Sequence, residues 1–263
     1  MNRALSFSAS RASAPWWFGL GILAAAALLL APPLPEPAMF RVFIDERAFL
    51  GIPSFWNVVS NLPLLLVGAW GIYVVARSDE RAFVDPLEKW PYGLCFGAVA
   101  LAGIGSTWFH LAPDGDRLMW DRLPIALGFM ALLAGVISER ASVRAAMRAL
   151  APLLVAGAGS VLYWRWSMVH GAENIVPYAV VQYGALAAIV VLATLRSRYT
   201  QGADLFVVAA VYAAAKAVEV LDRPIYELGG LVSGHTLKHL LAAVAVGWLV
   251  RSLELRRPLS LPS

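Results

Sequence analysis

Long apolar runs separated by short charged segments dominate the hydrophobic pattern of this chain. A helix needs ~20 apolar residues to cross a bilayer, with a range of ~17–25. Apolar and polar residues do not alternate along the runs, as they would in the strands of a membrane β-barrel. The pattern therefore predicts an all-α polytopic membrane protein with eight spans, at residues 16–31, 55–76, 90–110, 118–138, 150–166, 175–195, 205–221 and 235–250.

The first run is the shortest, and it allows two interpretations. It follows Arg3 and Arg11 and ends in a proline-rich segment at 32–35, as a cleaved signal peptide also could. Its apolar stretch is long for a signal peptide, however, and no convincing small-x-small cleavage site precedes the prolines. We therefore expect an extra N-terminal transmembrane helix within residues 1–54, a seven-helix transmembrane bundle over 55–251 and a cytoplasmic tail over 252–263.

Positive charges alternate between the two sides of this map. With a cytoplasmic N-terminus, 13 of the 21 Lys and Arg residues fall in cytoplasmic segments and five on the opposite side. This bias is the one that the positive-inside rule predicts, so both termini are expected in the cytoplasm. The cytoplasmic set is Arg3, Arg11, Arg77, Arg81, Lys89, Arg140, Arg144, Arg148, Arg196, Arg198, Arg251, Arg256 and Arg257, and the opposite set is Arg41, Arg47, Arg117, Arg165 and Arg223.

Composition agrees with a membrane protein and excludes several other classes. The chain is 60% hydrophobic and only 14% charged, whereas soluble domains are ~25% charged. Its net charge of +4 reflects the loops and gives no reason to expect a nucleic-acid partner. Cys95 is the only cysteine, which excludes an internal disulfide and a metal site built from several thiolates.

Histidines near the ends of the predicted spans suggest a metal site. His235 and His239 are four residues apart, so they share one helix face and can bind one metal ion with a third ligand. His110 ends the third span one turn after Ser106, and Asp121 begins the fourth. The charge asymmetry places all five residues near the outer face. They therefore predict a site for a divalent metal.

A second polar group lies toward the same side of its spans. Polar groups within a span are costly and usually face a partner or a cavity. One interpretation is packing through interhelical hydrogen bonds and an ion pair between Lys216 and Glu219. The other is that these side chains orient the histidine ligands. The group comprises Asn57, Ser60, Asn61, Lys216, Glu219 and Asp222.

Other features receive structural interpretations. His170 is expected to be an exposed loop residue. Aromatic residues near span ends predict an interfacial belt, and three glycines on one span predict close helix approach. The aromatic residues are Trp90, Tyr92, Trp164, Trp166 and Tyr199, and the glycines are Gly97, Gly103 and Gly105.

These motifs resemble the alkaline ceramidase family and its wider CREST superfamily, in the form of a bacterial-type member. The shared pattern is a serine, a histidine four residues later, an aspartate eleven residues after that, and an H-x-x-x-H pair in the last helix. The segment 55–61 (FWNVVSN) resembles the opening helix of the ceramidases, and Leu123-Pro124 fits the helix that holds the aspartate. The residues that match are Ser106, His110, Asp121, His235 and His239.

The resemblance implies a zinc-dependent membrane amidase that hydrolyses ceramide-like lipids taken from the bilayer. His110, His235 and His239 would bind Zn²⁺, Asp121 would act as general base, and Ser106 would donate a hydrogen bond to the oxyanion. The residues alone predict only metal-assisted hydrolysis. The expected location is a bacterial inner membrane, with the site toward the outer leaflet and no protein partner implied.

Calcium is not carried over from the family. Alkaline ceramidases of eukaryotes have a Glu just before the FWN stretch, as part of an acidic calcium site, and this chain has Ser54 there. Asp45 and Glu46 lie nearby but do not match the spacing. No calcium site is therefore predicted.

Two other functions fit the same sequence features. A receptor-like or signalling member of the superfamily could retain the histidines around a structural metal. A transporter or a haem protein could also place histidines in the membrane. Haem usually takes axial histidines from facing helices, and transport predicts broken helices near mid-membrane, whereas the polar residues here lie toward one face.

Overall fold

The computed structural model describes residues 26–27, 30, 32–37, 41–79 and 82–259. The helix predicted over 16–31 lies outside the described residues, apart from 26–27 and 30. The choice between an extra helix and a signal peptide falls there too.

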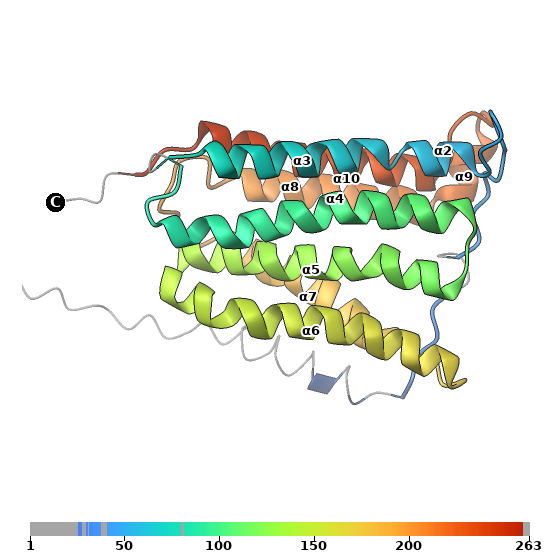
Figure 1. Cartoon of the computed structure of the whole chain (residues 1–263), viewed down its shortest axis with the longest axis horizontal. Helices are drawn as coiled ribbons and strands as arrows, with labels where there is room; N and C mark the ends of the chain where they lie inside the picture. The colour runs from blue at the N-terminus through green and yellow to red at the C-terminus, as the bar shows by residue number, and fades with distance from the viewer. Residues whose placement is uncertain (1–25, 28–29, 31, 38–40, 80–81, 260–263) are drawn as a thin grey trace, which may run out of the picture.

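The described part of the chain is a bundle of long helices (Figure 1). Six segments are long and apolar enough to cross a membrane, and α8, with 17 residues, corresponds to the seventh predicted span. The prediction of an all-α polytopic membrane protein is confirmed. The helices are α2 (Phe55–Val59), α3 (Leu62–Arg77), α4 (Lys89–Leu111), α5 (Gly115–Arg140), α6 (Val143–Val169), α7 (Val176–Ala193), α8 (Asp204–Val220), α9 (Asp222–Glu227) and α10 (Gly234–Leu255), with a 3₁₀ turn, η2, at Pro86–Glu88.

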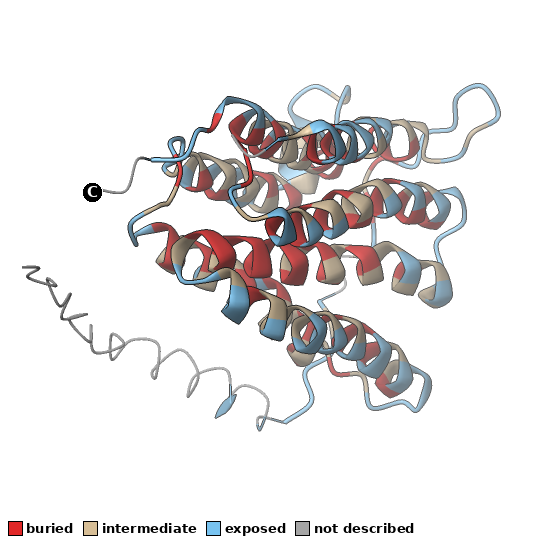
Figure 2. Cartoon of the chain, turned by 60° about the vertical axis from the view of Figure 1, so that its left-hand side comes forward, coloured by how far each residue is buried: buried red, intermediate tan, exposed pale blue. Residues whose placement is uncertain are grey.

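Buried residues gather on the inward faces of the helices (Figure 2). The larger hydrophobic cluster joins residues of α3, α4, α5, α7, α8 and α10. Helix α5 lies against α4, α6 and α7, and its central residues Ala126, Ala131 and Val136 are fully buried. Small side chains at these positions let the neighbouring helices approach α5 closely.

The predicted second span is interrupted at Ser60 and Asn61, between α2 and α3. Pro63 explains the break, because proline has no N–H to donate to the carbonyl oxygen of Val59, four residues earlier. The Asn61 carbonyl oxygen instead accepts from the backbone of Leu64 and Leu65, at 3.1 and 3.3 Å. The interruption lies at the end of the bundle where α2 and α9 are found (Figure 1).

Helices α4 and α5 meet most closely at Gly105. A Cβ atom added there would overlap the carbonyl oxygen of Trp120 and lie 3.3 Å from the Cα atom of Asp121. Pro124 has no N–H, so the Trp120 carbonyl oxygen lacks the donor that a helix usually places four residues later. Glycine at 105 therefore lets the Ser106 turn of α4 approach the Asp121 turn of α5.

The glycine prediction holds for Gly103 and Gly105 and is wrong for Gly97. A Cβ atom on Gly103 would lie 2.8 Å from the Leu65 backbone nitrogen, whereas one on Gly97 would meet no atom within 4 Å. Gly97 therefore faces open space rather than a neighbouring helix.

The aromatic belt is only partly as predicted. Trp90 and Trp166 are exposed, but Tyr92, Trp164 and Tyr199 are buried. The polar atoms of these three find buried or half-buried carboxylates, which a sequence pattern does not reveal: Trp164 donates to Glu173 at 3.0 Å, Tyr92 donates to Glu139 at 2.5 Å, and Tyr199 donates to Glu88.

The end of the bundle opposite α9 is closed by Arg256, just beyond α10. Its buried guanidinium pairs with Glu139 and donates to the carbonyl oxygen of Ala82 at 2.6 Å. It also lies 4.4 Å from the ring centroid of Phe83 and 4.2 Å from that of Tyr199. These contacts fix the C-terminal end of α10 against α4 and α5, away from the predicted site.

Candidate metal centre

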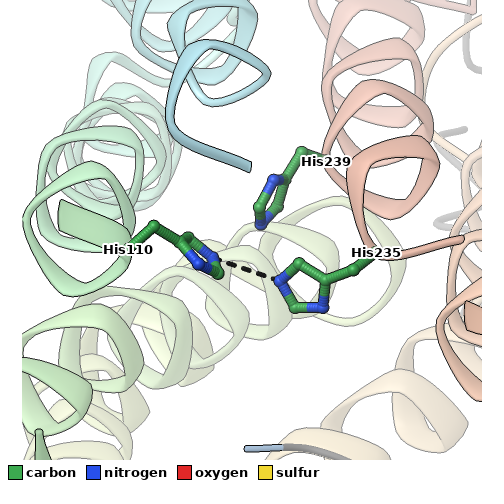
Figure 3. A group of neighbouring side chains, drawn as sticks. All are labelled: His110, His235 and His239. Carbon is green, nitrogen blue, oxygen red and sulfur yellow. Dashed lines mark hydrogen bonds between the residues drawn. The ribbon is translucent and has the colours of Figure 1, made fainter. Parts of the chain in front are cut away.

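Three buried histidines from two helices converge at one end of the bundle (Figure 3). His110 comes from the last turn of α4, and His235 and His239 come from the first two turns of α10. One ring nitrogen of each lies within 4.8 Å of the other two. The Nε2 atoms of His110 and His235 are 3.1 Å apart. The three predicted metal ligands therefore lie together.

The N-terminus of α10 is fixed by its own cap and by a carboxylate. The Ser233 side chain accepts from the Thr236 backbone at 3.1 Å, and Asp222 accepts from the His235 backbone at 2.7 Å. These bonds satisfy N–H groups that have no partner within the helix. A side chain at Gly234 would overlap the Val218 carbonyl oxygen. The sequence S-G-H-T thus places His235 close against the end of α8.

The Nδ1 atom of His239 lies 2.8 Å from the hydroxyl of Ser60. This contact fixes which ring nitrogen faces outward and leaves Nε2 directed at the other two histidines. Ser60 can reach the ring because it lies in the interruption between α2 and α3. Of the two predicted roles for the second polar group, orientation of a ligand fits Ser60.

The packing around His110 and His235 includes Phe43, which sequence analysis did not single out. Its ring centroid lies 4.7 Å from that of His110 and 4.3 Å from that of His235. The Nδ1 atom of His110 is buried with no hydrogen-bond partner in the described part of the chain. The orientation of that ring therefore depends on the aromatic contacts of Phe43 and Phe109.

The donor set fits a transition-metal ion such as Zn²⁺. Neutral imidazole nitrogens bind zinc at ~2.0–2.1 Å, and tetrahedral geometry then places two nitrogens about 3.3 Å apart. The separation of 3.1 Å between the Nε2 atoms of His110 and His235 is close to this value. Three protein ligands are the number that catalytic zinc sites keep. The histidine cluster could therefore hold a metal ion, and its all-nitrogen donor set favours zinc over calcium or magnesium.

Ser106 and Asp121 lie beside the histidines. The Ser106 hydroxyl is 3.5 Å from His239 Nε2, and Ser106 and Asp121 line the same cavity. Asp121 is only half-buried because its exposed surface faces an internal cavity, which it lines. The close approach of α4 and α5 at Gly105 thus brings a hydroxyl and a carboxylate to the metal centre.

The remaining members of the second polar group have separate roles. The predicted pair of Lys216 and Glu219 is present. Asp222 accepts from the backbone of His235 and from that of Ile44 at 3.2 Å, so it joins the loop before α2 to the start of α10. Asn57 accepts from Thr236 at 2.9 Å, which links α2 to α10.

Two charged residues contact this region unexpectedly. Lys238 lies between His235 and His239 in the sequence, and its Nζ atom is 3.2 Å from His235 Nε2 and 3.0 Å from Glu219. Arg122, next to Asp121, is buried against the ring of Trp164 and pairs with Glu36. Lys238 was visible only as a charge at the end of a span. Glu36 gave no signal in the sequence because it belongs to a proline-rich segment before the bundle.

A cavity of about 380 Å³ extends from the histidines into the bundle. Near the metal centre its walls include Asn61, whose Oδ1 atom is buried without a hydrogen-bond partner among the described residues. Most of the other walls are apolar side chains of α4, α5, α7, α8 and α10, among them Val99, Leu132, Leu186, Val208 and Leu249. They also include Gln182 of α7, which donates to the hydroxyl of Tyr212 on α8 at 2.5 Å. The cavity therefore combines a polar end beside the histidines with a largely apolar remainder.

No protein-family model matches the chain, and a comparison with curated proteins finds no match. The function therefore has to be argued from the chemistry of the site. The fourth histidine takes no part in this site. His170 is exposed at the end of α6, where its Nδ1 atom lies 2.8 Å from the Trp166 carbonyl oxygen.

Replacement of Ser60 by alanine is expected to weaken zinc binding about 10- to 100-fold. It removes the hydroxyl that holds the Nδ1 atom of His239, and partners of this kind typically contribute that much to metal affinity. Competition with a chromophoric chelator measures the zinc Kd. Ser160→Ala is the control, since the buried Ser160 hydroxyl donates to the Gly157 carbonyl oxygen of its own helix, at 2.8 Å. Equal Kd values for the two variants would show that Ser60 does not orient the ligand.

Proposed function

We propose that the protein is a zinc-dependent integral-membrane amidase that hydrolyses the N-acyl bond of ceramide-like lipids. The products would be a fatty acid and a sphingoid-type amine. The observation that carries the proposal is the convergence of three buried imidazoles with Asp121 and Ser106 at the polar end of the cavity. These are the residues on which the resemblance to the ceramidase family rests.

A zinc ion held by His110, His235 and His239 would supply an activated water molecule near neutral pH and polarise the substrate carbonyl. The chain's own residues supply the remaining steps. The Asp121 carboxylate, which faces the cavity, accepts a proton from the attacking water and passes it to the leaving amine. The Ser106 hydroxyl, 3.5 Å from His239 Nε2, donates a hydrogen bond to the oxygen that becomes negatively charged.

The shape of the cavity supports a lipid substrate. Its largely apolar lining, with side chains such as Val99, Leu132 and Leu249, suits an acyl chain, because burial of each CH₂ group contributes ≈ 0.8 kcal/mol. The polar end then receives the amide group. Phe43 lies against both His110 and His235 and excludes water from that side of the metal centre. A cavity of this shape would bind the acyl chain of the lipid and so hold the amide group beside the histidines.

Purified protein incubated with a panel of N-acyl lipids tests the proposal. Mass spectrometry of the products should detect fatty acid release from at least one amide. Treatment with a chelator should abolish the release, and added Zn²⁺ should restore it. Release that is unaffected by complete removal of metal would contradict the zinc-dependent mechanism. Absence of hydrolysis across the panel by zinc-loaded protein would contradict the amidase assignment.

A further inference from the structure

Two of the chain's lysines lie in the cavity beside the metal centre. Lys216 is on α8 and Lys238 is on α10, and both contact the carboxylate of Glu219. The distance from Lys238 Nζ to Glu219 Oε1 is 3.0 Å. The other lysine, Lys89, begins α4 at the far end of the bundle and donates to the Ser78 carbonyl oxygen at 2.6 Å. Lysines within spans are costly, so a paired location in a cavity indicates a function.

Lys238 also contacts one of the proposed metal ligands. Its Nζ atom lies 3.2 Å from the Nε2 atom of His235. That nitrogen has a single lone pair, which a bound metal ion would occupy. An N–H group of the Lys238 ammonium then needs another acceptor. Because Lys238 lines the cavity, a ligand bound there can provide it. This step rests on the proposed metal site.

Charge balance indicates what kind of acceptor is favoured. The charged side chains that line the cavity, apart from histidines, are equal in number: Arg122, Lys216 and Lys238 against Glu36, Asp121 and Glu219. A divalent metal ion bound by neutral imidazoles therefore leaves the site with two uncompensated positive charges. Because an apolar interior penalises unbalanced charge, a ligand that brings negative charge is favoured over a neutral one.

We propose that the substrate carries a carboxylate beside the scissile amide, and that Lys238 and Lys216 bind this group. The class is the N-acyl amino acids, whose carboxylate is attached to the carbon next to the amide nitrogen. This places the carboxylate near Lys238, which itself lies 3.2 Å from a proposed metal ligand. Glu219 contacts both ammonium groups, so it holds Lys216 and Lys238 near each other in the cavity wall.

The reaction with such a substrate is hydrolysis without a further co-reactant. The oxygen of water bonds to the acyl carbon, the carbon–nitrogen bond breaks, and the released proton goes to the amine. The products are a fatty acid and a free amino acid. The lysines take no part in breaking the bond, and they determine which amide is held at the metal centre.

Binding tests this inference separately from turnover. Zinc-loaded Asp121→Asn protein, which the proposed mechanism makes inactive, is titrated with N-oleoylglycine and with N-oleoylethanolamine, which replaces the carboxylate by a hydroxymethyl group. N-oleoylglycine is expected to bind about 10-fold tighter or more, since hydrogen bonds to charged groups are the strong ones. Equal affinity for the two ligands would overturn the inference.

Lysine variants made in the Asp121→Asn protein test which residues cause the preference for N-oleoylglycine. Lys238→Met and Lys216→Met should each bring the two affinities to within about threefold, while Lys89→Met should leave the preference unchanged. Each methionine variant leaves Glu219 with one lysine, so the carboxylate stays paired. Zinc content is measured in every variant. A full preference retained in both Lys238→Met and Lys216→Met would overturn the assignment of these residues.

Kinetics of the active protein separate the two proposals. Hydrolysis of N-oleoylglycine with a kcat/KM about 10-fold above that of N-oleoylethanolamine would support amide hydrolysis at the histidine cluster and the preference for a carboxylate. Equal hydrolysis of the two amides would support the amidase and overturn the carboxylate preference. Tighter binding of N-oleoylglycine without hydrolysis of any amide in the lipid panel would support the lysine site and contradict the amidase.

Discussion

Replacement of any one of His110, His235 and His239 by alanine is expected to abolish bound zinc and amide hydrolysis together. Each substitution removes one of three nitrogens that converge within 4.8 Å, and a zinc ion with only two protein ligands falls below the three that catalytic sites keep. Metal content by elemental analysis should fall from about one zinc per chain to background. Hydrolysis should fall by at least ~10³-fold, since activation of water depends on the ion.

His170 provides the matched control for this series. It is exposed at the end of α6, and its contacts are with Trp166 of the same helix. His170→Ala should therefore retain both zinc and activity. Full activity in a metal-free triple variant of His110, His235 and His239 would exclude the metal mechanism. Zinc retained in all three single variants would exclude this cluster as the metal site.

Replacement of Asp121 by asparagine should preserve zinc and abolish turnover. The amide keeps the shape of the side chain, but it cannot accept the proton from water. General base catalysis contributes ~10²–10⁴-fold, so kcat should fall within that range while zinc content stays the same. Single-turnover kinetics on metal-quantified protein measure the effect.

Asp116 is the control for Asp121 on the same helix. Its side chain is 73% exposed and pairs with Arg165 at the surface, so Asp116→Asn should leave kcat unchanged. Loss of zinc in Asp121→Asn would make Asp121 a contributor to metal binding instead of a base. Unchanged turnover in that variant would remove it from the mechanism.

The amidase and the lysine site make different demands on the same cavity. In the proposed mechanism the histidines, Ser106 and Asp121 would break the amide bond, whereas Lys216 and Lys238 would determine which amide is bound. The resemblance to ceramidases suggests a substrate with neutral hydroxyl groups, and the cavity's charge suggests one with a carboxylate. Comparison of the two amides therefore distinguishes a ceramide-like substrate from an N-acyl amino acid.

Much of the fold follows from the sequence, because a transmembrane helix satisfies its backbone within itself and needs only a run of apolar residues. The seven predicted spans of the described chain correspond to α2–α3, α4, α5, α6, α7, α8 and α10. The interruption at Ser60 also has a local cause, Pro63. The mostly apolar run nevertheless predicted one continuous helix there, because a hydrophobicity pattern is not changed by the loss of one backbone N–H.

The sequence by itself also grouped the principal site residues. Spacing put His235 and His239 on one helix face, and charge asymmetry put His110, Ser106 and Asp121 at the same end of their spans. These inferences needed only the period of a helix and the direction in which each span crosses the membrane. The convergence of the three histidines in the structure agrees with them.

Only the tertiary structure decided which residues surround that cluster. Phe43 and Glu36 precede the bundle and reach the site through loops whose path no periodicity encodes. Lys238 and Glu219 meet because α10 packs against α8, and Ser60 reaches His239 because α3 begins late. Such contacts depend on the rotation and depth of each helix against its neighbours. The rotation and depth of each helix are set by side-chain packing across the whole bundle. No short stretch of the sequence therefore predicts them.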